Sequence, residues 1–250
     1  MIDVHCHLTY QSMRENLPAI LDSARKEMQS VITCGLVNDA KDALELRRNN
    51  KEFVHLTLGI HPEDVVAMRD EQIERHMDLI RSVRRDIVGI GEIGLDYHWI
   101  KEPDQIKRCK EWFRKFLDLA AEMKLPVVLH TRKAEEDSFE IVSQTDLRNV
   151  VFHHYSGSVT LAQQIVDRGY YISMPTITPT SKNLLKIAER FPLSQLVTET
   201  DSPFNSPYPG KGNVPQNVRV TIEKIAERRG MSFDQVDAIL SRNARDIFGI

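Results

Sequence analysis

The chain has 250 residues, 41% of them hydrophobic and 28% charged, a composition that argues against a disordered chain and against a membrane protein. This length is close to that of one complete (β/α)8 barrel and supports a large core without disulfides. The formal net charge of −3, from 36 acidic and 33 basic residues, argues against a protein that holds long duplex DNA by phosphate contacts alone.

Short apolar runs recur from the N-terminus onward, and amphipathic helical stretches lie between them, the pattern of βα units that build a parallel sheet. The eight predicted strands are 2–5, 30–34, 53–60, 87–90, 126–130, 149–153, 170–174 and 196–199. The predicted helices are 18–29, 40–49, 71–85, 107–124, 159–168 and 181–191, with two more at 216–229 and 232–248.

Eight strands of this kind predict an α/β protein, a single (β/α)8 TIM barrel with C-terminal helices that occupies residues 1–250 as one domain. The alternative is an open doubly wound sheet, which also alternates strands and helices. An open sheet of that type usually has a glycine-rich phosphate turn after its first strand. Here His-Cys-His-Leu follows instead, which favours the closed barrel.

The three cysteines, Cys6, Cys34 and Cys109, are widely spaced and form no C-x-x-C pair, so neither a disulfide framework nor a structural zinc knuckle is indicated. Their usage is typical of a reducing cytosol. No basic segment followed by an apolar stretch opens the chain, and a candidate ligand already stands at position 5. We therefore expect a cytoplasmic protein with no membrane contact and no obligate protein partner.

Imidazole and carboxylate side chains fall at the C-terminal ends of predicted strands, where barrel active sites are assembled. Any one of them alone is more often a hydrogen-bonded core histidine or a helix cap. The set is harder to explain by packing, because charged groups at the ends of apolar strands are costly unless they are paired or bound to metal. Its members are His5, His7, Glu92, His130, His153 and Asp201.

Four imidazoles and two carboxylates suit two divalent ions that share one carboxylate, with zinc, manganese or, less well, magnesium as the metal. We assign His5, His7 and Asp201 to the first ion. His130 and His153 bind the second, and Glu92 bridges the two. Such a pair lowers the pKa of a shared water, and Asp201 can accept the proton of that water as general base. Asp201 and Glu92 are thus the expected catalytic residues.

Several segments together resemble the TatD family of metal-dependent deoxyribonucleases: DVHCHL near the start, GIHP at 59–62, GEIGLDY at 91–97, LHTR at 129–132, HHYSGS at 153–158 and TETDSP at 198–203. The resemblance spans the chain in order. It implies a TIM barrel of the amidohydrolase-like superfamily and places metal ligands at the same six positions. His154 departs from the family pattern, which commonly has cysteine there. We expect His154 to alternate away from the mouth and leave it out of the ligand set.

The resemblance implies hydrolysis of phosphodiester bonds in DNA, and we expect an exonuclease acting on single-stranded ends. Candidate phosphate contacts are His61, Arg132 and Lys211. The loop around Lys211 lacks the arginine usual in the family, which weakens that expectation. Aromatic residues that could stack on bases are Tyr97, Trp99, Tyr155 and Tyr208.

Two alternatives stay open, because a fold does not fix a substrate. The first is an amidohydrolase-like enzyme that acts on a small amide, lactone or phosphoester. The second is a metal-bound binding module without catalytic activity, which would be expected to lack a ligand or a base.

Overall fold

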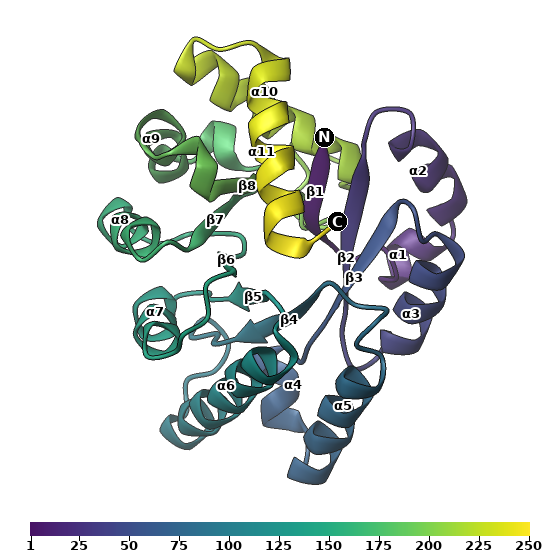
Figure 1. Cartoon of the computed structure of the whole chain (residues 1–250), viewed down its shortest axis with the longest axis vertical. Helices are drawn as coiled ribbons and strands as arrows, with labels where there is room; N and C mark the ends of the chain where they lie inside the picture. Colours follow the sequence, from purple (N-terminus) through teal and green to yellow (C-terminus); the bar gives the residue numbers. More distant parts are fainter.

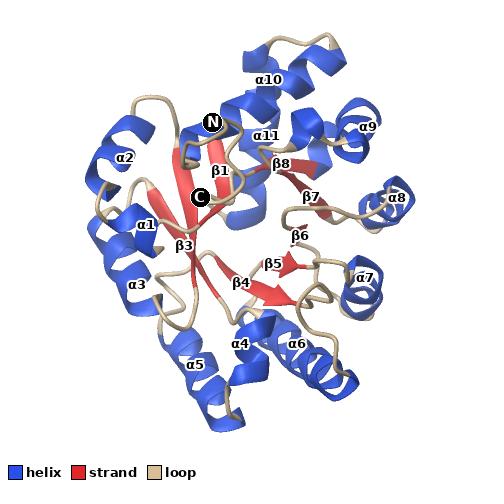
Figure 2. Cartoon of the chain, turned by 180° about the vertical axis from the view of Figure 1, so that it is seen from behind, coloured by secondary structure: helices blue, strands red, loops and turns tan.

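A computed structural model describes residues 1–250 and confirms the predicted TIM barrel. Eight parallel strands lie side by side in chain order, and the helices surround them (Figures 1 and 2). The strands are β1 Ile2–Cys6, β2 Ser30–Gly35, β3 Val54–Leu58, β4 Gly89–Gly94, β5 Val127–His130, β6 Val150–Phe152, β7 Tyr171–Met174 and β8 Leu196–Thr198.

The eleven α-helices form the outer layer of the barrel and cover one of its ends. They are α1 Gln11–Arg14, α2 Leu17–Ala24, α3 Ala40–Asn49, α4 Pro62–Ala67, α5 Asp70–Ser82, α6 Pro103–Met123, α7 Glu135–Ser143, α8 Val159–Asp167, α9 Lys182–Arg190, α10 Val218–Arg229 and α11 Phe233–Phe248. None of them is long and apolar enough to cross a membrane.

Three of these helices, α1, α4 and α7, were not predicted, because they have only four to nine residues and give weak periodic patterns. The predicted helix 18–29 is also too long, since α2 ends at Ala24. The predicted fourth strand, 87–90, is displaced: β4 runs from Gly89 to Gly94. Glu92 therefore lies inside this strand and not after it.

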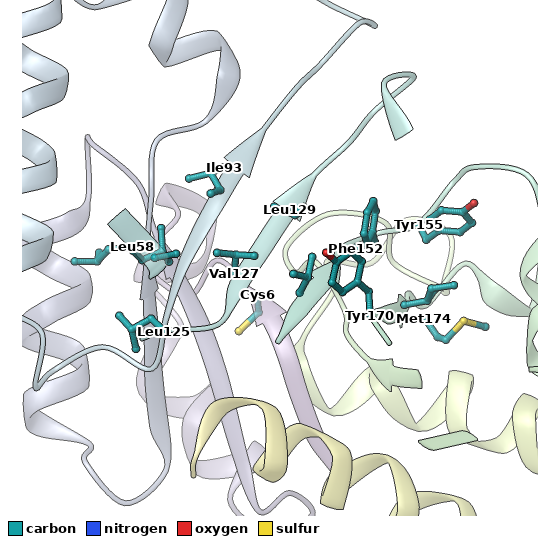
Figure 3. Close-up of a cluster of buried hydrophobic side chains, with 14 of the residues drawn as sticks. Cys6, Leu58, Ile93, Leu125, Val127, Leu129, Phe152, Tyr155, Tyr170 and Met174 are labelled. Atoms are coloured by element: carbon teal, nitrogen blue, oxygen red, sulfur yellow. The ribbon is translucent and has the colours of Figure 1, made fainter. Parts of the chain in front are cut away.

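The main hydrophobic core lies between the strands and the surrounding helices. Strand residues such as Leu58, Ile93 and Leu129 belong to it (Figure 3). Side chains of α6 and the other outer helices belong to the same cluster. Successive side chains of a strand point to opposite faces.

A second, smaller cluster joins the other strand face to the C-terminal helix. It contains Val4, Val128 and Val197 of three strands, together with Ile247 and Phe248 of α11. The end of α11 lies at the start of the strands, since the Asn149 side chain before β6 donates to the carbonyl of Ile247 at 3.1 Å. This helix covers the N-terminal end of the barrel and leaves the opposite end open.

The seam between β8 and β1 is joined by residues that follow the strands. The amide of Asp201 donates to the carbonyl of His5 at 2.9 Å, and the amide of His7 donates to the carbonyl of Ser202 at 2.7 Å. Asp3 accepts hydrogen bonds from the amide and hydroxyl of Thr200 at 3.0 and 2.5 Å. These bonds bring His5 of β1, and His7 just beyond it, next to the carboxylate that follows β8.

Candidate metal centre

A cavity of about 610 Å³ opens at the C-terminal end of the barrel. Five of the six predicted ligands line it, and the sixth, His5, is buried directly against them. The cavity is lined by His7, Tyr10, Leu36, His61, Glu63, Glu92, Asp96, Trp99, His130, Thr131, Arg132, His153, His154, Ser156, Asp201, Phe204 and Asn205. Residues nearly 200 positions apart thus meet at one place.

Glu92 stands between two pairs of imidazoles, one pair at each carboxylate oxygen. Its Oε2 lies 3.6 Å from Nε2 of His5 and 3.8 Å from Nε2 of His7. Its Oε1 lies 2.5 Å from Nδ1 of His130 and 3.6 Å from Nε2 of His153. Each carboxylate oxygen therefore has two imidazole nitrogens near it, and the two pairs adjoin one another, since the ring centroids of His5 and His153 are 3.8 Å apart.

Asp201 completes the group around the first pair of imidazoles. Its Oδ1 lies 3.4 Å from Nε2 of His7 and 3.8 Å from Nε2 of His5. Those two nitrogens are themselves 3.2 Å apart. Three donor side chains on this side of Glu92 are thus directed toward a common point.

Close backbone contacts place Glu92 and His130 in the mouth. A Cβ atom on Gly59, at the end of β3, would stand 2.4 Å from the carbonyl oxygen of Glu92. A Cβ on Gly94, which has a φ of 142°, would stand 2.1 Å from the carbonyl oxygen of His130. Only glycine permits approaches this close, so both positions need it.

Two carboxylates outside the predicted set hold two of the histidines. Asp96 Oδ2 lies 2.9 Å from Nε2 of His130. Glu199, fully buried, lies 3.0 Å from Nδ1 of His153 and accepts a hydrogen bond from the amide of His154 at 2.7 Å. Sequence reasoning missed both residues. The available signal was an acidic side chain close to a candidate ligand, within GEIGLDY for Asp96 and TETD for Glu199.

The carboxylates of the site favour the protonated form of two of its histidines. Burial opposes protonation of His130, but Glu92 and Asp96 outweigh it and raise the pKa of His130 to about 9. At His153, Glu199 and Glu92 likewise outweigh burial and raise the pKa to about 10.

The two carboxylates among the predicted ligands are held in the ionised form. Burial would raise the pKa of Glu92, but His130 and His153 bring it well below its ordinary value. Burial acts in the same direction on Asp201, and the hydrogen bond from His7 outweighs it and lowers the pKa. Both carboxylates are therefore in the form that binds cations.

The predicted phosphate-contacting residues do not all lie at the cavity. His61 and Arg132 line the cavity, whereas Lys211 is exposed on a loop and does not line it. The expectation that His154 alternates away from the mouth is wrong. His154 lies beyond the end of β6 with a φ of 45°, so strand alternation no longer applies, and its ring reaches the side chain of Asn205 at 3.0 Å.

The donor set fits divalent metal ions. His5, Glu92 and His153 offer ligand atoms within 4.8 Å of one another, and so do His61, Asp96 and His130. Nδ1 of His5 is buried without a hydrogen-bond partner, so the contacts of this ring with the site are all made by Nε2. Imidazole and carboxylate donors together suit zinc and manganese in particular.

A (β/α)8 barrel whose mouth gathers these donors has the architecture of a metal-dependent hydrolase. The sequence model of the family described as TatD related DNase matches residues 2–249. This chain belongs to the TatD family, and it is a metal-dependent hydrolase acting on ester bonds.

Individual relatives agree with this assignment over their whole length. The chain is 38% identical over 248 residues to MJ1582, an uncharacterized metal-dependent hydrolase of Methanocaldococcus jannaschii, covering 99% of this chain and 96% of that protein. It is 26% identical over 258 residues to the human deoxyribonuclease TATDN3, covering 99% and 94%. The crystal structure of YjjV, a TatD homologue from Escherichia coli, superposes with a TM-score of 0.90 at 26% identity and covers 100% of this chain and 98% of that one.

Proposed function

We propose that this hydrolase is a deoxyribonuclease that cleaves phosphodiester bonds of DNA from single-stranded ends with two divalent ions. The family description and the name of human TATDN3 support the substrate. The observation that carries the mechanism is the position of Glu92, each of whose two oxygens lies near a different pair of imidazoles.

In this proposal His5, His7 and Asp201 would hold one ion, His130 and His153 would hold the other, and Glu92 would be shared between them. The geometry supports the division, because Oε2 of Glu92 faces the first pair of rings and Oε1 faces the second. Two bound cations would lower the pKa of a shared water and polarise the bond to be cleaved. Their identity is proposed as zinc, manganese or magnesium.

The chain's own residues position the substrate and move the proton. Asp201 is ionised and lies at the cavity surface, so its carboxylate can accept the proton of the attacking water. The guanidinium of Arg132 and the ring of His61 line the same cavity and would contact phosphate oxygens. Lys211 lies outside the cavity and is left with at most a peripheral contact to the DNA.

The size and charge of the molecule favour single-stranded ends over long duplex. A cavity of about 610 Å³ is in the range of small-ligand pockets and cannot enclose a double helix. The chain as a whole has a net charge of −3 and lacks the basic character of a duplex binder.

We also propose that residues 1–250 form one barrel domain that works in the cytosol without an obligate partner. The family match to residues 2–249 supports one domain. The three cysteines are buried and unpaired, as is typical of proteins in a reducing compartment.

The test is cleavage of an end-labelled single-stranded oligonucleotide by manganese-loaded protein. We expect stepwise release of mononucleotides and two metal ions per chain by elemental analysis. The Asp201→Asn variant should be slower by about 10²- to 10⁴-fold, because it loses the general base. Glu92→Ala should lose both activity and metal, whereas His154→Ala should retain both ions.

Three results would contradict the proposal. Clean protein that releases no nucleotides, with Asp201→Asn indistinguishable from it, would exclude the nuclease. Cleavage of a small amide, lactone or phosphoester in place of DNA would favour the small-molecule alternative. A metal content of about one ion or none would exclude the two-ion centre.

A further inference from the structure

Exposed aromatic side chains gather around one opening of this molecule. Four large hydrophobic side chains are exposed in the chain: Trp99 by 60%, Tyr208 by 47%, Tyr10 by 46% and Phe204 by 41%. Three of them, all except Tyr208, line the cavity of the metal centre. Large exposed apolar groups concentrated at one opening indicate a binding surface.

Two of these side chains form a pair at one side of the mouth. Tyr10 follows β1 and Phe204 follows β8, the two strands that meet at the barrel seam. Their rings pack edge to face, with centroids 5.0 Å apart and planes at 70°. Phe204 also lies 6.0 Å from the ring of His7. The pair therefore stands directly beside the first group of candidate ligands.

Trp99 lies on another side of the mouth. It follows β4, which is four strands away from β8 around the ring. The guanidinium of Arg132 lies 5.8 Å from the centroid of its ring. Both aromatic groups line the cavity that also holds the candidate metal ligands, so a substrate held at the centre would extend toward both.

Both aromatic groups are anchored to the centre through hydrogen bonds. The amide of Trp99 donates to Oδ1 of Asp96 at 2.9 Å, and the other oxygen of Asp96 holds His130. The amide of Phe204 donates to the carbonyl of Asp201 at 2.9 Å. The backbone of Trp99 is therefore held by a turn that starts at Asp96, the partner of His130, and the backbone of Phe204 by a turn that starts at the candidate ligand Asp201.

Away from the proposed metal ions, the side chains of the cavity offer little positive charge to a nucleic-acid backbone. Arg132 is the only arginine or lysine in the lining, which also contains four carboxylates, those of Glu63, Glu92, Asp96 and Asp201. Beyond the phosphate at the metal centre, affinity along the strand then comes from contacts other than backbone charge. Stacking of bases on aromatic rings is such a contact, and every base offers a face for it.

We infer that the Tyr10–Phe204 pair and Trp99 are two stacking platforms for unpaired nucleobases on either side of the scissile phosphodiester. This inference rests on the proposed deoxyribonuclease function. It names the structural reason for a single-stranded substrate, because bases within a duplex are already stacked on one another and cannot lie against these rings.

The test uses a deoxyadenosine trimer with methylphosphonate linkages, which has bases but no backbone charge. Trp112 is buried, so in a Trp112→Phe protein the exposed Trp99 is the only tryptophan that reports binding. We expect the trimer to quench the fluorescence of Trp99, with little dependence on salt. A matched abasic trimer should cause no quenching.

Variants then separate the platforms from the rest of the surface. Phe204→Ala and Tyr10→Ala should each weaken binding of the trimer about tenfold. Tyr208→Ala removes an exposed aromatic side chain outside the cavity and is the matched control, with no change expected. In parallel, Trp99→Ala in the otherwise native protein should raise the KM for a single-stranded oligonucleotide more than it changes kcat.

Failure of the inference differs from failure of the proposed function. Equal binding of the trimer and its abasic counterpart, or equal loss in Tyr208→Ala and Phe204→Ala, would overturn the platforms even if DNA is cleaved. Binding of the trimer with the expected variant pattern, but without any cleavage of DNA, would support the platforms and exclude the nuclease. If Trp112→Phe does not fold, an unchanged KM for DNA in Trp99→Ala would overturn the inference.

Discussion

At the residue scale, Asp96 and Glu199 determine which nitrogen each histidine presents to Glu92. Asp96 contacts Nε2 of His130, which leaves Nδ1 toward Glu92, whereas Glu199 contacts Nδ1 of His153, which leaves Nε2 toward Glu92. Carboxylates in this position fix the ring orientation and the tautomer of metal-binding histidines. Both belong to the centre outside the six predicted ligands.

Glu199→Gln should therefore weaken binding of manganese about 10- to 100-fold. The amide group of glutamine would place a donor against either Nδ1 of His153 or the amide of His154, which both donate to Glu199. Calorimetric titration of metal into the apoprotein measures the effect. Glu227→Gln, on the exposed face of α10, is the control, and equal affinities in both variants would contradict the positioning role.

At the element scale, the two strands that carry a ligand before their last residue, β1 and β4, have irregular pairing, whereas β5 ends on its ligand His130. The pairing of β1 with β2 shifts register between Asp3 and Cys6, around His5. The pairing of β4 with β5 shifts between Ile90 and Ile93, around Glu92. Such irregularities redirect side chains near active sites. The regular strands β6 and β8 supply their ligands from residues just beyond their ends.

The packing of β3 beneath α3 gives a prediction for acid stability. Burial, with the charge of Arg47 of α3, lowers the pKa of His55 from 6.5 to about 4. As the pH falls below 6.5 the unfolded chain takes up this proton first, so stability is present above 6.5 and is lost toward pH 4. Between about pH 7 and about pH 5 the loss should be about 1 kcal/mol, allowing for partial exposure.

Urea unfolding of the chelated protein and of His55→Gln at the two pH values measures this contribution. The chelator removes the effect of pH on metal binding. The variant should lose less stability on acidification than the native chain. Equal losses of unfolding free energy in the two proteins on acidification would show that His55 does not titrate as described.

At the scale of the whole molecule, one end of the barrel carries the candidate metal centre and the other end carries packing that stabilises the fold. The C-terminal end holds the candidate metal centre, and the N-terminal end is covered by α11, whose Ile247 and Phe248 pack against Val4, Val128 and Val197 of the strands. TIM barrels generally separate catalysis and stability in this way.

Phe248→Ala should accordingly destabilise the chain by about 3 kcal/mol, because it leaves a cavity under the strands. Metal content and cleavage by the folded fraction should stay unchanged, since the substitution lies at the opposite end from the ligands. Urea unfolding measures the loss of stability, and elemental analysis measures the metal content. Ile250→Ala, at a partly buried neighbour, should have a smaller effect. Loss of metal in folded Phe248→Ala would contradict the separation of the two ends.

The sequence by itself determined the barrel and the positions of the six candidate ligands, because apolar runs and the polar residues that end them are local features. Tertiary structure decided how the ligands face one another, that Asp96 and Glu199 hold two of them, and that His154 turns into the cavity. Of the aromatic residues expected to stack on bases, Tyr155 is buried and the hydroxyl of Tyr97 is paired with Asp137. The contact of Tyr10 with Phe204 also depends on the tertiary structure. The physical reason is that periodicity describes side-chain direction only within a regular strand. Contacts across the ring depend on register shifts and on loop backbone beyond the strand ends, where alternation no longer holds.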